Sequence, residues 1–184
     1  MSYLYSLEQG SLEGLRAEVD RIRSGPFPTD EYCALRGLEP DEAAEMFGYV
    51  DEDVRILDIA VHRTHWEDPF SPIDKLDWHE YETLLDQVGG ISEAAGKLVI
   101  DLFEGPPLDI RPDEWGYHGS LEADSVDRLR SLLEPVVGAA ADRLQADPRA
   151  WDEPLTSHRL VGPARVLAVL RPVAPGKDVI VGLG

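Results

Sequence analysis

The sequence has one cysteine, few basic residues and no long hydrophobic run. Cys33 has no partner in the chain for a disulfide or for a Cys-x-x-Cys metal or redox site. No apolar stretch approaches the roughly 20 residues that a membrane-spanning helix needs. The first residues lack the basic segment and apolar segment of a secretory signal. We therefore expect a cytoplasmic protein without a membrane partner.

Several motifs of enzymes are also missing from the sequence. It contains no P-loop, no GxGxxG motif and no GxSxG nucleophile elbow. Cys33 follows Asp30 and Glu31, and nearby negative charge disfavours a reactive thiolate. These absences predict no phosphate-containing cofactor and argue against nucleophilic catalysis. They leave open whether the protein is an enzyme, although we lean towards a protein that is not.

Acidic residues dominate the composition, with 36 Asp and Glu against 17 Lys and Arg and a formal net charge of -19. Residues 154–184 hold four basic residues and one acidic residue, so their charge is 4 - 1 = +3 and residues 1–153 carry -22. Such a surface repels nucleic acid and anionic membranes, and it attracts a basic protein. The alternative is that the charge serves only solubility.

Hydrophobic periodicity predicts a mostly helical α+β protein that forms a single globular domain over residues 1–184. Alternation in MSYLYSL indicates an opening strand, and Ser11 is a suitable N-cap for the helix after it. Residues 25–36 and 105–119 are expected to be loops, because they contain glycine and proline. The ending VIVGLG predicts a terminal strand, so we expect a small sheet that pairs the N- and C-terminal strands.

Several helices are expected between the terminal strands, and the type of one segment is ambiguous. Residues 53–62 suit a helix or a strand, and the acidic residues that precede them favour the helix. Helices are also expected from Asp77, from Ser92 and from Glu122, where the first ends at Gly89-Gly90 and Pro135 interrupts or restarts the last. We also expect a helix after Pro40.

The order of elements resembles that of the YfbM-like family of uncharacterised bacterial proteins. The likeness lies in Ile73-Asp74-Lys75 with Trp78-His79 and Leu84-Leu85, in the stretch from Tyr117 to Leu129, and in Lys177 to Gly182. About half of the chain takes part. The resemblance implies a compact α+β domain and no established activity.

Residues 61–82 contain three of the five histidines, with two tryptophans and several carboxylates. On a helix, His62 and His65 share one face, and Asp58 or Asp68 supplies an oxygen ligand, so these residues are candidates for a metal site. The spacing lacks the glutamate of an HExxH motif, and histidines at the end of a helix need no metal to explain them. We therefore assign no metal to the protein.

Acid/base chemistry is a second interpretation of this stretch. His79 and Glu80 lie in the first turn of an expected helix beside two aromatic residues, and His118 lies between glycines. Each also has a structural explanation, since Glu80 caps a helix and His118 belongs to a packed loop.

The leading functional hypothesis is a protein-binding module of the inhibitor or immunity type, whose acidic and aromatic surface docks a basic partner. The alternatives are a small metal-dependent or acid/base enzyme that uses the cluster at residues 58–80, and an accessory homo-oligomeric domain. The oligomeric state is open. The expected partner-binding residues are Trp66, Asp68, Phe70, Asp77, Trp78, Glu80, Tyr81, Trp115 and His118.

Overall fold

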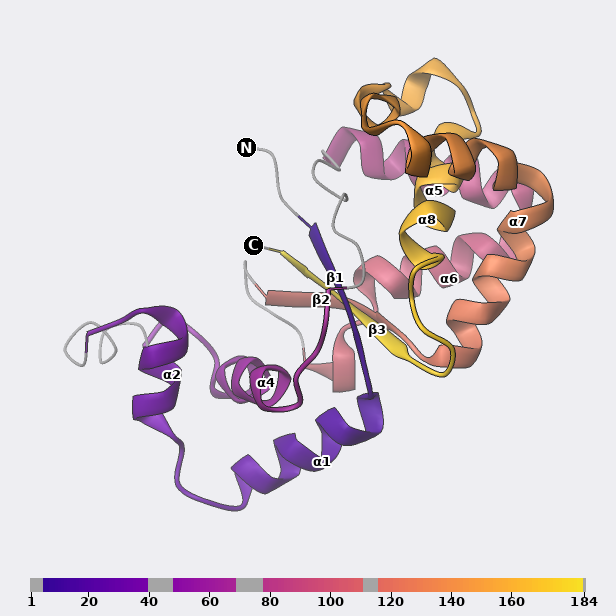
Figure 1. Ribbon diagram of the computed structural model, residues 1–184. Helices are drawn as coiled ribbons and strands as arrows, with labels where there is room; N and C mark the ends of the chain where they lie inside the picture. Colours follow the sequence, from indigo (N-terminus) through magenta and orange to yellow (C-terminus); the bar gives the residue numbers. More distant parts are fainter. Residues whose placement is uncertain (1–4, 40–47, 69–77, 111–115, 184) are drawn as a thin grey trace.

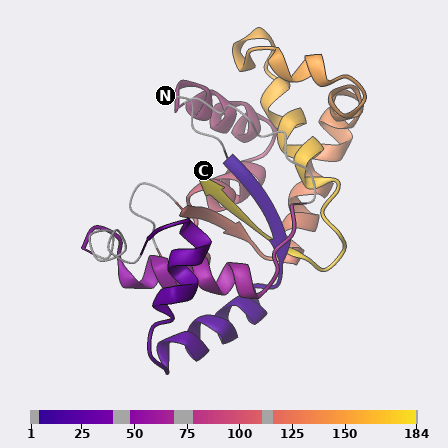
Figure 2. The ribbon, with the colours of Figure 1, turned by 60° about the vertical axis from the view of Figure 1, so that its left-hand side comes forward.

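The computed structural model describes residues 5–39, 48–68, 78–110 and 116–183. These residues form a small antiparallel sheet with helices on both of its faces (Figure 1). Figure 2 shows the same arrangement from a second direction. The predicted α+β class is therefore confirmed.

The sheet has three strands in the order β1-β3-β2. Strand β3 (Asp178–Leu183) lies in the centre and pairs antiparallel with β1 (Tyr5–Gly10) and with β2 (Gly116–Leu121). The N- and C-terminal strands pair as predicted. Strand β2 contradicts the end of the loop expected over residues 105–119, because residues 116–119 belong to this strand. Gly119 in this strand lies against a helix, and a Cβ there would be 1.8 Å from the Leu102 carbonyl oxygen. This glycine therefore serves close packing rather than a turn.

One face of the sheet is covered by three helices of the described residues, which we call the N-terminal layer. They are α1 (Leu12–Arg23), α2 (Thr29–Arg36) and α4 (Glu52–Arg63). Ile180 of β3 is fully buried on this side and belongs to a core that includes Leu15, Val19, Leu57 and Ile59. Helix α4 confirms the helical interpretation of residues 53–62.

The opposite face of the sheet is covered by the C-terminal layer. Its helices are α5 (Trp78–Ile91), α6 (Glu93–Glu104), α7 (Ala123–Ala146) and α8 (Val161–Leu170). The short 3-10 helices Pro148–Asp152 and Leu155–Ser157 join α7 to α8, and a third, Pro107–Asp109, precedes β2. Leu7, Val179 and Val181 face this layer and pack in its core with side chains such as Leu102, Leu129, Leu133 and Leu167.

Three further local predictions are wrong. Residues 29–36 form α2 instead of a loop, and this helix buries Tyr32 and Cys33. Helix α5 continues through Gly89-Gly90 to Ile91, and α7 continues through Pro135. In α7 the buried side chains on both sides of the exposed proline pack against the rest of the layer, so tertiary contacts outweigh the local cost of proline. The helix expected after Pro40 lies outside the described residues.

Side-chain caps fix the start of several helices. Ser11 caps α1, as predicted, by accepting a hydrogen bond from the Gly14 N–H, and Asp51 caps α4. Asp178 at the start of β3 accepts from the N–H of Leu12 at 2.6 Å and from the N–H of Ala123 at 2.8 Å. One carboxylate of the central strand therefore holds the first turns of α1 and α7, one helix from each layer. Of the helices in the described ranges, none has the length and apolar character to cross a bilayer.

Candidate functional site

A pocket of about 520 Å³ opens on the face of the sheet that carries the N-terminal layer. It lies between the three strands, helices α2 and α4, and the segment that follows α4. Its volume is in the range of small-molecule sites. The residues that line it are Ser6, Glu8, Leu35, Arg36, Asp58, Val61, His62, His65, Trp66, Glu67, Gly116, Tyr117 and Gly182.

The strand register creates the floor of this pocket. Side chains alternate along a strand, so Ser6 and Glu8 of β1 face away from Leu7, which is buried in the C-terminal layer. Gly182 of β3 pairs with Ser6 on one side and with Tyr117 on the other. A Cβ at Gly182 would lie 3.1 Å from Ser6 Oγ and 3.2 Å from Tyr117 Cδ1. Glycine therefore lets Ser6 and Tyr117 pack more closely over the central strand than a side chain at this position would allow.

Glu8 and Tyr117 form a hydrogen-bonded pair on this floor. The Tyr117 hydroxyl donates to Glu8 Oε1 over 3.3 Å. Burial raises the pKa of Glu8; the bond from Tyr117 opposes this shift, and the negative charge of Asp68 adds to it. Burial also raises the pKa of Tyr117, and the charges of Glu8 and Asp58 act in the same direction. The long hydrogen bond thus leaves Glu8 incompletely compensated for its lost hydration.

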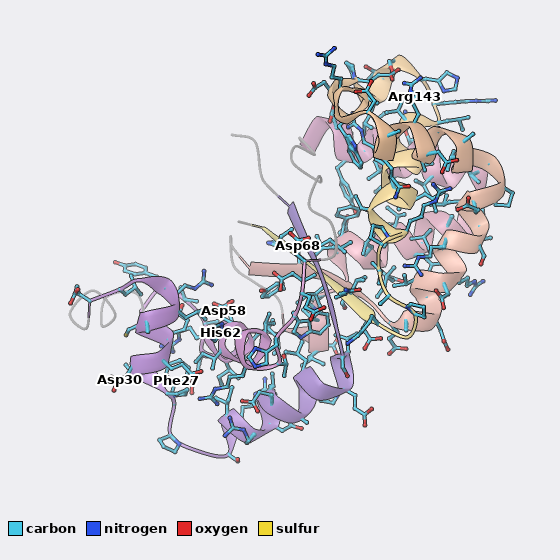
Figure 3. All side chains as sticks on the ribbon, viewed as in Figure 1. Phe27, Asp30, Asp58, His62, Asp68 and Arg143 are labelled. Atoms are coloured by element: carbon cyan, nitrogen blue, oxygen red, sulfur yellow. The ribbon has the colours of Figure 1, made fainter. Side chains whose placement is uncertain are left out.

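Asp58 and Arg36 form an ion pair on the helical side of the pocket. Asp58 projects from α4 with 7% of its surface exposed, and Arg36 is the last residue of α2. Burial raises the pKa of Asp58, while the positive charge of Arg36 opposes the shift. Asp58 raises the pKa of Arg36 although burial acts against it. Figure 3 shows Asp58 and His62 together on α4.

The segment after α4 closes one side of the pocket. His65 has a φ of 51°, which turns the chain out of the helix, and the N–H of Glu67 donates to the Gln9 carbonyl at 3.0 Å. The Trp66 ring covers β1, because a Cβ at Gly10 would lie 2.4 Å from Trp66 Cδ2. Its indole Nε1–H is buried and has no acceptor in the described part of the chain.

The candidate metal ligands do not form a metal site among residues that the structure places. His62 lies in the last turn of α4, which ends at Arg63, so His65 is beyond the helix and does not share a helical face with it. Both histidines line the pocket. No group of three or more His, Cys, Asp or Glu side chains in the described ranges is arranged to hold a metal ion.

The expected partner-binding residues are divided between the two layers. Trp66 lines the pocket, and Asp68 acts electrostatically on Glu8. Glu80 and Tyr81 lie on α5, across the sheet. The expectation that Tyr81 binds a partner is corrected by its position in the core. Its side chain is buried and its hydroxyl donates to Glu104 at 2.7 Å, so it presents no side chain to a partner.

The remaining expected contacts are placed only in part. His118 lies on β2 and is half-buried. Phe70, Asp77 and Trp115 fall outside the described residues, as do the side chains of Trp78 and His79 at the start of α5. The expected single surface is therefore not assembled by the residues that the structure places.

Sequence reasoning missed Glu8, Arg36 and Tyr117 as pocket residues. The polar positions of the opening strand, Ser6 and Glu8, were a signal for Glu8, since they alternate with buried Leu7. Arg36 carried no signal, because its partner is 22 residues away on another helix.

Comparisons with models of protein families, with curated proteins and with solved structures find no match to this chain. The resemblance to the YfbM-like family therefore stays a prediction.

Proposed function

We propose that the protein is a binding module for a basic protein, and that this partner docks over the pocket. The observation that carries the proposal is the charge of the pocket lining. Glu8, Asp58 and Glu67 contribute -3 and Arg36 contributes +1, so the lining has a formal charge of -2 with neutral histidines. A concave anionic site focuses its field and attracts a cationic partner.

The chain's own cations support the proposal, because most of the described arginines are already engaged. Arg63 binds Glu18 and Glu31, and Arg171 binds Glu134 and Asp142. Further arginine pairs involve Arg21, Arg23, Arg36, Arg130, Arg143 and Arg165. The surplus of carboxylates is therefore available to a partner rather than to this chain's own basic residues.

The aromatic residues of the pocket add contact area. Trp66 and Tyr117 lie beside Glu8 in the lining. Tryptophan and tyrosine are over-represented among residues that dominate binding energy, and they combine an apolar ring with a hydrogen-bonding atom. We expect the ring of Trp66 to report binding through its fluorescence.

The test is a titration with a hexa-arginine peptide at several salt concentrations. We expect one-to-one binding that weakens about tenfold between 50 and 500 mM salt. The reason is that salt shortens the Debye length, the distance over which exposed charges interact, from about 10 Å in 0.1 M salt to about 3 Å in 1 M salt. Binding that is indifferent to salt would contradict the proposal.

A pair of charge-matched variants separates the pocket from general acidity. One variant carries Glu8→Gln and Glu67→Gln, and the other carries Glu13→Gln and Glu52→Gln on exposed first turns of α1 and α4. Each pair removes two charges. We expect at least about fivefold weaker binding for the pocket pair than for the control pair, since only close charges are incompletely screened. Equal losses would place the partner elsewhere.

A second candidate function is acid/base catalysis in the same pocket. It is supported by the raised pKa of Glu8, which results mainly from burial, because shifted carboxylates are frequent in active sites. The test is the hydrolysis of p-nitrophenyl acetate and of p-nitroanilides by the purified protein. Turnover that is lost in Glu8→Gln and retained in Glu13→Gln would support catalysis, and equal rates in the three proteins would remove it.

A further inference from the structure

We infer that the pocket is a subsite for one guanidinium group, carried by an arginine side chain of a peptide. This inference rests on the proposed function and narrows it, because it names the group that enters the pocket. It depends on four observations: the incomplete bonding of Glu8, the guanidinium already held at the pocket wall, the aromatic rings of the lining and the indole N–H of Trp66.

Among the described residues, Glu8 has a single long hydrogen bond to its carboxylate. In the part of the chain that the structure places, the hydrogen bond from the Tyr117 hydroxyl at 3.3 Å reaches only Oε1. A carboxylate accepts about four hydrogen bonds, and one that is partly removed from water, as Glu8 is, loses stability when they are not made. A guanidinium presents two parallel N–H donors with the spacing of a carboxylate, and its charge compensates that of Glu8.

The wall of the pocket already accommodates a guanidinium group. Arg36 reaches from α2 to the buried carboxylate of Asp58 on α4, and both residues line the pocket. This pair satisfies Asp58 from within the chain. Glu8 on the facing strand has no corresponding arginine among the described residues. The guanidinium group of a bound ligand takes the place of that arginine.

The shape of the lining distinguishes guanidinium from other cations. The rings of Trp66 and Tyr117 border the pocket, and planar guanidinium groups stack on such rings. A lysine ammonium is a compact and strongly hydrated charge, so it gains less from these rings. The described residues also offer no ligand set for a metal ion.

Trp66 supplies an independent reason to expect a peptide. Trp66 lines the pocket, and its Nε1–H is buried without an acceptor in the ranges that the structure describes. A buried donor that makes no hydrogen bond is destabilising. The backbone carbonyls on either side of a bound arginine are acceptors that a free guanidinium ion does not bring, and the indole ring has to turn towards the pocket to donate to one of them.

The experiment compares four probes by NMR chemical-shift titration at 20 mM salt. They are acetyl-Gly-Arg-Gly-amide, the same peptide with lysine, the same peptide with citrulline, and ethylguanidinium. We expect saturable shifts at the pocket residues with the arginine peptide, binding at least fivefold weaker with lysine, and none with citrulline, which keeps the shape without the charge. We also expect ethylguanidinium to bind more weakly than the arginine peptide.

Glu8→Gln is the decisive variant, and Glu13→Gln on α1 is its control. We expect Glu8→Gln to weaken the arginine peptide about tenfold and to reduce its preference over lysine, while Glu13→Gln leaves both unchanged. Thermal unfolding of both variants verifies that they are folded. If ethylguanidinium bound as tightly as the peptide, the inference that a peptide carries the guanidinium group would be wrong.

The failure of this inference differs from the failure of the proposed function. Equal affinity for arginine and lysine peptides, or equal affinity in Glu8→Gln and the unaltered protein, would overturn the guanidinium subsite. Salt-dependent binding of hexa-arginine would then still support a basic partner. Absence of binding by every basic peptide would overturn both.

Discussion

The two layers on either side of the sheet differ in what they bury. The C-terminal layer has an apolar core around Leu102, Leu129 and Leu133. The N-terminal layer buries Asp58, the one polar or charged residue among the buried side chains described, and it holds the pocket. The comparison indicates that one layer supplies stability and the other accepts a cost in stability to present charged groups.

A second contrast exists within the N-terminal layer itself. Glu18 and Glu31 bind Arg63, and hydrogen bonds from arginine lower the pKa of each. Glu8 and Asp58 have raised pKa values because burial outweighs their partners. Ion pairs on the outside of the layer therefore favour the ionised carboxylates, whereas the pocket disfavours them. The four predictions below test this division.

The largest effect is expected from Leu133→Ala in α7. Leu133 has 0% exposure in the core of the C-terminal layer. Its truncation leaves a cavity and should lower the free energy of unfolding by about 3 kcal/mol. Because the pocket is across the sheet, affinity for the arginine peptide should change less than about twofold in the folded variant. Urea unfolding and peptide titration measure the two quantities.

The exposed Val136 on the same helix provides the control for this change. Val136→Ala should alter the free energy of unfolding by less than about 0.5 kcal/mol. A large loss of peptide affinity in folded Leu133→Ala would show that the C-terminal layer also shapes the pocket.

Much of the architecture follows from the sequence, and the reasons are local. Alternation identified the first strand, the ending VIVGLG identified the last, and Ser11 located the start of α1. Strand β2 was missed because glycine normally weakens strands, while Gly119 is required by the close approach of α6. The continuity of α7 through Pro135 depends on packing that a single sequence does not display.

The pocket was less predictable than the fold. The histidine and tryptophan cluster indicated His62, His65 and Trp66, which do line it. Their chemical partners come from distant segments, as Tyr117 is 109 residues from Glu8. Such pairs arise from strand order. The order β1-β3-β2 includes β2, which the sequence pattern did not identify as a strand.

The second prediction tests the buried ion pair with Arg36→Ala. The change leaves Asp58 buried without its partner, and loss of one member of a fully buried pair costs about 3–5 kcal/mol. Because the Arg36 side chain is 39% exposed, we expect a smaller loss of about 2 kcal/mol in urea unfolding. Adding Asp58→Asn to Arg36→Ala should restore part of it.

Arg21→Ala is the matched control, since Arg21 pairs with Glu18 and is 62% exposed. Because solvent screens an exposed pair, its effect on urea unfolding should be close to zero. If Arg36→Ala were as mild as this control, the pair with Asp58 would be a surface contact and the contrast between the layers would weaken.

The third prediction concerns the residue that joins the layers, Asp178. Its carboxylate holds the first turns of α1 and α7, so Asp178→Ala should lower the free energy of unfolding by about 1–2 kcal/mol. Asp178→Asn keeps one acceptor and should lose less. Asp124→Ala, in the exposed first turn of α7, is the comparison and should change stability by about 0.5 kcal/mol or less. Similar losses in Asp124→Ala and Asp178→Ala would mean that a general effect of negative charge explains both, and that the hydrogen bonds of Asp178 add no stability of their own.

The smallest effect is expected from Glu8→Gln, measured as stability against pH. Because burial raises the pKa of Glu8 in the folded state above its ordinary value of 4.5, the folded protein binds more protons than the unfolded chain in the range just above pH 4.5. Glu8 therefore makes stability fall as pH rises through that range. Glutamine does not titrate, so the variant lacks this fall.

The stability of Glu8→Gln relative to the unaltered protein should consequently increase between pH 4 and pH 7 in urea unfolding. Asp58 titrates in both proteins, so its contribution cancels in the difference. Glu31→Gln should show the opposite slope, because arginine lowers the pKa of Glu31 and its ionised form adds stability above pH 4.5. Two parallel slopes would mean that the pocket carboxylate is as well compensated as those bound to Arg63, and the pocket would then have no deficit for a cation to fill.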